Sequence, residues 1–155
     1  MKIEERECVL LRMEAMEERK RSFLEDRGTK TMTDEFTFPF EKLEVWHLAI
    51  ELADFVLKIL ESFPKDKYYR LIGQTEAAVS SVAQNVAEGK GRQYKKEFIQ
   101  YLYVAEGSLF ELLTLVEISK RRRVIKDNEA IAIREQAETL DRKLHGLINS
   151  LRSRA

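Results

Sequence analysis

The densest cluster of functional side chains in this sequence is a run of basic residues. It comprises Lys120, Arg121, Arg122 and Arg123, with Lys126 shortly after. Ammonium and guanidinium groups bind phosphate oxygens, so the cluster is a candidate site for RNA or DNA. Alternatively, cations at the end of a helix complement its dipole. Since Lys+Arg and Asp+Glu both number 27, the net charge is zero, and nucleic-acid binding would depend on this local patch.

A second group surrounds the glycines at 89 and 91. We expect the preceding helix to end there on a left-handed glycine, Gly89 or Gly91. Glu88 would lie in the last helical turn, where the dipole disfavours a carboxylate, so we expect it to pair with Arg92. Asn85 is expected to satisfy unpaired groups at the helix end. The spacing does not match a Walker loop, although an anion could bind at the start of the next helix. We interpret the group as a structural corner.

Metal ligands are sparse at the expected spacings. A di-iron bundle needs two Glu-x-x-His pairs on facing helices, and the chain has one, from Glu44 to His47. The second histidine, His145, has Arg142 three residues before it. We therefore expect these residues to form a solvated face, and the sequence predicts neither a metal nor a cofactor.

The sequence also favours a protein without enzymatic activity. It contains no Gly-x-Ser-x-Gly elbow, and its single cysteine, Cys8, lies near the N-terminus. Glu97, Glu106 and Glu111 have basic neighbours, and we expect them to form ion pairs that fix the helices rather than an acid–base pair.

The elements that would position these residues are four amphipathic helices, over about 41–63, 68–88, 94–122 and 127–151. Each has apolar residues at i, i+3, i+4 and i+7. Short connections between such helices predict an all-α, antiparallel up-down-up-down four-helix bundle. The third helix has apolar residues outside one stripe, which predicts that another subunit or an additional element of this chain covers it. Gly107 in the same helix costs about 1 kcal/mol relative to alanine, which predicts close backbone approach there.

We divide the chain into an N-terminal arm, 1–35, which is helical or partly disordered, and the bundle domain, 36–155. The arm is either a partner-binding segment or a loosely docked helix. A lone cysteine and a charged N-terminus predict a cytoplasmic location. No apolar run approaches the roughly 20 residues that cross a bilayer, so we expect no membrane association.

Three motifs carry a resemblance to a known family. Residues 81–92 read S-V-A-Q-N-V-A-E-G-K-G-R, residues 96–111 read K-E-F-I-Q-Y-L-Y-V-A-E-G-S-L-F-E, and residues 43–46 read L-E-V-W. From about Phe40 to Leu151 the chain resembles the four-helix-bundle proteins encoded in intervening sequences of bacterial 23S rRNA genes. It is also similar to the accessory protein of diversity-generating retroelements.

The resemblance implies a left-handed bundle that assembles as a ring-shaped homopentamer, in a family without established enzymatic activity. We expect the protein to act as an oligomeric scaffold or adaptor that can have a protein partner. An alternative function is an accessory module that binds RNA, DNA or a reverse transcriptase. Glu106 departs from the arginine that the motif usually has, and Ala83 stands in place of a proline. The lost positive charge argues against the nucleic-acid alternative.

Overall fold

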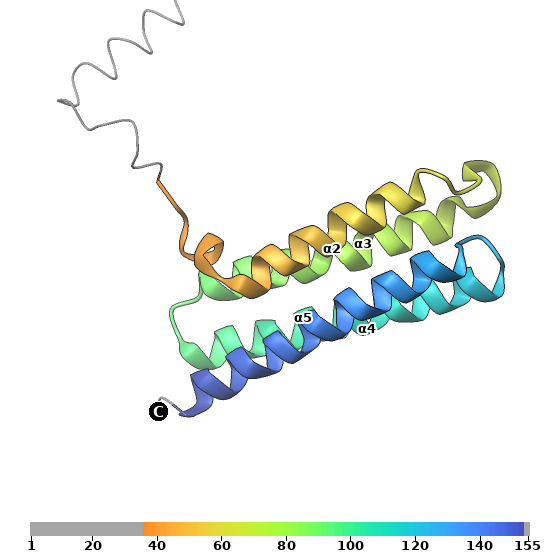
Figure 1. Ribbon diagram of the computed structural model, residues 1–155. Helices are drawn as coiled ribbons and strands as arrows, with labels where there is room; N and C mark the ends of the chain where they lie inside the picture. The colour runs from red at the N-terminus through yellow and green to blue at the C-terminus, as the bar shows by residue number, and fades with distance from the viewer. Residues whose placement is uncertain (1–35, 154–155) are drawn as a thin grey trace, which may run out of the picture. The chain divides into compact units, whose positions relative to one another are not determined.

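The computed structural model describes residues 36–153, which form four α-helices preceded by one short 3₁₀ helix. The elements are η1 (Pro39–Lys42), α2 (Glu44–Leu60), α3 (Lys65–Lys90), α4 (Lys95–Arg121) and α5 (Asp127–Ser153). The prediction of an all-α four-helix bundle is confirmed. Figure 1 shows the chain reversing direction at each connection. The predicted arm, 1–35, lies outside the described residues.

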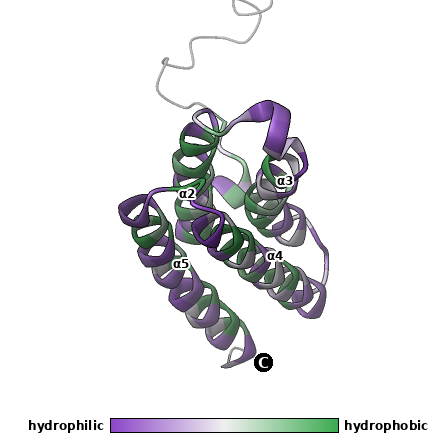
Figure 2. Cartoon of the chain, turned by 90° about the vertical axis from the view of Figure 1, so that its right-hand side faces the viewer, coloured by the Kyte–Doolittle hydropathy of each residue, from purple (hydrophilic) through white to green (hydrophobic). Residues whose placement is uncertain are grey.

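The core lies where the apolar stripes of the four helices meet. Each helix packs against two others, and α3 packs most extensively against α4. Figure 2 shows hydrophobic and hydrophilic residues alternating along each helix, as expected of amphipathic helices. Burying each large aliphatic side chain contributes about 1.5–3 kcal/mol. The largest fully buried side chains are those of Leu52, Val56, Val79, Val82, Val86, Leu102, Leu109, Leu112, Ile133, Leu140, Leu144 and Ile148.

The predicted start of the first helix at Glu41 is wrong, because residues 39–42 form the 3₁₀ turn η1 and α2 begins at Glu44. The Glu41 carboxylate accepts a hydrogen bond from the backbone N–H of Phe38. Phe40 then packs against Trp46, with ring centroids 5.2 Å apart. This aromatic contact fixes the entry to the bundle.

The α2–α3 connection and the α4–α5 connection lie at the same end of the bundle, as Figure 1 shows. The α3–α4 connection, which contains the glycine corner, lies at the opposite end. Among the described helices, none combines the length and the apolar character needed to cross a lipid bilayer.

Candidate functional site

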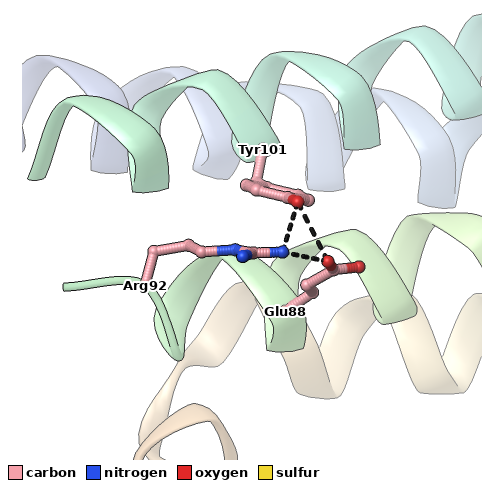
Figure 3. A network of polar contacts seen from close by, with 3 residues as sticks. All are labelled: Glu88, Arg92 and Tyr101. Carbon is pink, nitrogen blue, oxygen red and sulfur yellow. Dashed lines mark hydrogen bonds and ion pairs between the residues drawn. The ribbon is translucent and has the colours of Figure 1, made fainter. Parts of the chain in front are cut away.

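The glycine corner contains a closed network of three polar side chains from α3, the following turn and α4, drawn in Figure 3. Arg92 forms an ion pair with Glu88 and also donates a hydrogen bond to the Tyr101 hydroxyl. That hydroxyl donates to the Glu88 Oε1 atom at 2.9 Å. The Arg92 guanidinium carbon lies 4.7 Å from the centre of the Tyr101 ring. The expected Glu88–Arg92 pair is thus present, and Tyr101 is a member that the sequence did not suggest.

The network shifts the pKa of the Tyr101 hydroxyl. The Glu88 carboxylate, by accepting the hydroxyl hydrogen bond, raises the pKa of Tyr101 above its ordinary value. Partial desolvation raises the pKa further, while the nearby Arg92 charge opposes both effects. All three side chains are partly exposed, so the network joins two helices without burying a charge.

The expectation of a left-handed Gly89 or Gly91 is wrong. The helix continues through Gly89 to Lys90, and Gly91 follows with φ −77° in the right-handed region. Glycine is required at position 89 for space instead, since an added Cβ would lie 2.5 Å from the Cβ of Tyr101 and 3.0 Å from a ring carbon of Phe98. The absence of a side chain at Gly89 is what allows α3 and α4 to approach closely here.

Two further expectations about this region are corrected. Asn85 does not cap the helix end; its amide donates to the Ser81 carbonyl at 2.7 Å and to the Ser81 hydroxyl at 2.9 Å. Ser81 in turn hydrogen-bonds Ser108 of α4 at 2.9 Å, so the group links the two helices. Gly107 makes no close approach within the described part of the chain, because an added Cβ there would meet no atom within 4 Å.

The basic cluster occupies the end of α4 and the connection to α5. Arg121 donates to Glu117 at 2.8 Å and lowers the pKa of that carboxyl, and Lys126 lies 3.8 Å from Glu129. Arg122 and Arg123 are exposed and have no ion-pair partner among the described residues. Together with the exposed Lys120, three of the five cations of the cluster therefore have no carboxylate partner among the described residues.

Among the described residues other than glycine, Arg123 alone has a left-handed backbone conformation, with φ 55°. Its N–H bonds the Lys120 carbonyl at 2.9 Å, and the Val124 N–H bonds the Ser119 carbonyl at 3.0 Å. This is the Schellman pattern that ends a helix, usually with glycine at the left-handed position. The left-handed helix end that we expected at Gly89 or Gly91 is thus found at Arg123, at the end of α4.

Sequence reasoning missed a further group, formed by Glu106 of α4 with Asp141 and His145 of α5. It considered only carboxylates three residues before a histidine, whereas Asp141 lies four residues before His145. Glu106 belongs to another helix, and only the packing of α4 against α5 brings it to this histidine.

Comparison with known proteins gives one result that bears on the whole bundle. A sequence profile described as 23S rRNA-intervening sequence protein matches residues 41–146, which include α2, α3, α4 and most of α5. A comparison with curated proteins gives no match.

Proposed function

Since the chain belongs to the family of 23S rRNA-intervening sequence proteins, we propose that it is a non-enzymatic scaffold or adaptor that assembles with copies of itself. The observation that supports this proposal is apolar surface on two separate faces of the bundle. One is a groove between α2 and α3, and the other is the outward face of α4.

The groove has a volume of about 550 Å³ and is lined mainly by apolar side chains. Ile50 and Leu57 of α2 lie along it and are exposed. Small residues of α3, Ala83 and Ala87, form the other wall. Small side chains keep the groove open, so that apolar side chains of another copy could enter between the helices. Phe40 and Trp46 also line the groove, on the side of η1 and the start of α2.

The α4 strip consists of Val104, Gly107, Phe110, Thr114 and Ile118. At 100° per residue these positions share one side of the helix, and all five are exposed. Phe110 is 51% exposed and Val104 45%. Gly107 lies between them without a side chain, so a neighbouring helix could come close to the α4 backbone there.

Because the groove and the α4 strip lie on different faces, binding of the strip of one copy in the groove of another gives a head-to-tail assembly. When a surface of one copy binds a different surface of the next, the contact is heterologous and generates a ring if the rotation closes. In this arrangement the α4 strip of each copy occupies the α2–α3 groove of its neighbour. Five copies is the number that the resemblance to the family implies, and the zero net charge means that copies do not repel one another.

Light scattering on variants of each face tests this assembly. The wild type should have a mass well above that of an 18.2 kDa monomer. Ile50→Glu places a charge in the groove and Val104→Glu places one on the strip, so each variant alone should be a monomer. Mixed together, they should form a one-to-one dimer, because each retains the face that the other needs.

A matched control is Ile131→Glu on α5, which changes a similarly exposed apolar residue outside both faces and should assemble like the wild type. Helical circular dichroism should be unchanged in all three variants, since each replaced residue is exposed. A monomeric wild type, or variants that assemble normally, would contradict the proposal.

Binding of RNA or DNA is the second candidate function, and Arg122 and Arg123 are the observation in its favour. Lys65 and Lys67, at the start of α3, belong to the same end of the bundle in Figure 1. Replacing Arg122 and Arg123 with glutamine should weaken binding equally for all sequences and flatten its dependence on salt. Replacing Arg121, which already pairs with Glu117, is the matched control and should have a smaller effect. An electrophoretic shift assay that finds no binding by the wild type at low salt would rule this function out.

A further inference from the structure

Where α4 and α5 face each other, three side chains of metal-binding type converge. They are Glu106 of α4 and, one turn apart on α5, Asp141 and His145. Residues at i and i+4 share a helix face, so Asp141 and His145 both point toward Glu106. One nitrogen or oxygen atom from each side chain lies within 4.8 Å of the other two.

The imidazole lies between the two carboxylates. Its Nε2 atom is 3.1 Å from Glu106 Oε1, and its Nδ1 atom is 3.7 Å from Asp141 Oδ1 and 3.2 Å from the Asp141 backbone oxygen. Glu106 has only 14% of its side chain exposed, whereas His145 has 51%. One ligand is therefore held in the interface between the helices, and the histidine lies at its open edge.

The Asp141 Oδ1 atom carries the strongest indication of a missing partner. It is buried, and no donor among the described residues hydrogen-bonds to it. A buried polar atom without a partner costs about 1–3 kcal/mol, and more if it is charged. The two cations that follow Asp141 in the sequence pair with other carboxylates, Arg142 with Glu138 and Lys143 with Glu44.

We propose that Glu106, Asp141 and His145 bind a divalent transition-metal ion of the Zn²⁺ type. Carboxylate oxygens and imidazole nitrogen bind zinc at about 2.0–2.2 Å, which requires the three side chains to close by roughly 1 Å around the ion. The ion supplies positive charge to Asp141 Oδ1 and to Glu106. Imidazole makes Mg²⁺ and Ca²⁺ poorer candidates, because these ions prefer oxygen ligands alone. The exposed side of His145 provides the path of entry, and water completes the coordination.

Such an ion would join α4 to α5 within a single chain. Its binding would therefore not require the proposed contact between the groove of one copy and the α4 strip of another. The site has three protein ligands, and a fourth position is filled by solvent. Its role here is to bind the metal and hold two helices together, and no reaction is assigned to it.

Calorimetric titration of chelator-treated, full-length protein with Zn²⁺ tests the site. The wild type should bind one ion per chain. Glu106→Gln and His145→Gln should each weaken binding by at least the 10–100-fold that loss of an outer-shell partner causes at zinc sites. Because His145 is half exposed, His145→Gln should fold normally even if Glu106→Gln does not. The visible absorption spectrum of bound Co²⁺ gives a second readout, and it should change in His145→Gln.

Three controls remove other ligands and should bind as the wild type does. His47→Gln replaces the other histidine of the chain, Cys8→Ser removes the only thiol, and Glu138→Gln removes an exposed carboxylate one turn from Asp141. The proposal is overturned if the wild type binds no Zn²⁺, or if Glu106→Gln and His145→Gln bind it as tightly as the wild type.

Discussion

The hydroxyl of Tyr101 on α4 hydrogen-bonds both members of the Glu88–Arg92 ion pair at the end of α3. It donates to Glu88 and accepts from Arg92, and its ring lies beside the Arg92 guanidinium. Its Cβ atom also lies where a side chain at Gly89 would have to be. Tyr101 thus takes part in the hydrogen-bond network of the corner and also leaves no space for a side chain at position 89.

Replacing Glu88 by glutamine should lower the pKa of Tyr101. The carboxylate is the main cause of the raised value, and without its charge the opposing effect of Arg92 remains. The absorbance of tyrosinate, followed through an alkaline titration, measures the change. Subtracting the titration of Tyr101→Phe isolates this phenol from the other tyrosines. An identical curve for Glu88→Gln would contradict the network.

The raised pKa also predicts how stability depends on pH. A phenol that holds its proton more tightly in the folded state stabilises that state below the ordinary tyrosine pKa of about 10. This contribution is lost as the pH rises through the higher pKa of the folded state. The melting temperature of the wild type should therefore fall relative to that of Tyr101→Phe as the pH is raised above about 10.

Arg123→Gly should stabilise the protein. A left-handed conformation costs a residue with a Cβ about 1–2 kcal/mol, and glycine adopts it without that strain. The greater freedom of glycine in the unfolded chain offsets part of the gain, so we expect about 0.5–1 kcal/mol. Urea denaturation measures it, with Arg122→Gly as a control, since Arg122 has φ −80° and should not gain. A lower midpoint for Arg123→Gly would mean that this turn is not strained.

At the scale of the helices, the sequence predicts the elements well and their ends less well. The apolar stripes place all four helices, because a period of 3.6 persists over many residues. Helix ends depend on single residues. The glycines at 89 and 91 mark the end of α3 within two residues, since the helix ends at Lys90, but neither glycine is left-handed. Gly89 is still helical, and its missing side chain leaves space for Tyr101. The left-handed turn at Arg123 could not be predicted from the sequence, because no glycine occupies that position.

Gly89 and Gly107 should respond in opposite ways to alanine. At Gly89 the new methyl group meets the Cβ of Tyr101, which cannot rotate away, and overpacking costs about 1–3 kcal/mol. Alanine regains about 1 kcal/mol of helix propensity, so a net loss of roughly 1 kcal/mol is expected. At Gly107 nothing is close, so only the gain remains and the isolated chain is stabilised.

Urea denaturation of both variants measures these two effects. If copies assemble through the α4 strip as proposed, Gly107→Ala should also weaken association, because its methyl group lies on that strip. Light scattering under dilution measures this effect. A Gly89→Ala variant as stable as the wild type would show that α3 and α4 are not in close contact at the corner.

At the scale of the whole molecule, what the sequence could not predict is contact between helices far apart along the chain. Glu106 and His145 are neighbours only because α5 returns beside α4. Ser81 and Ser108 meet for the same reason across α3 and α4. Periodicity determines which side of a helix is buried, but it does not determine which residues of two packed helices lie opposite each other along their axes. The contacts between polar residues in the candidate sites depend on that alignment.

Residues 37–155 should fold without the segment that precedes them. Within the part of the chain that the structure describes, every buried core residue lies between Val45 and Ile148. The shortened chain also keeps Phe40, which packs against Trp46 at the start of α2. Residues 37–155 also form a separate unit by their internal contacts. A chain that starts at Thr37 should therefore show the helical circular dichroism of a bundle and a cooperative thermal transition within a few degrees of that of the full-length protein. Since the groove and the α4 strip both lie in this unit, the shortened chain should also assemble like the full chain in light scattering. A molten or insoluble product would mean that the first 36 residues complete the core, and a folded monomer would mean that they take part in assembly.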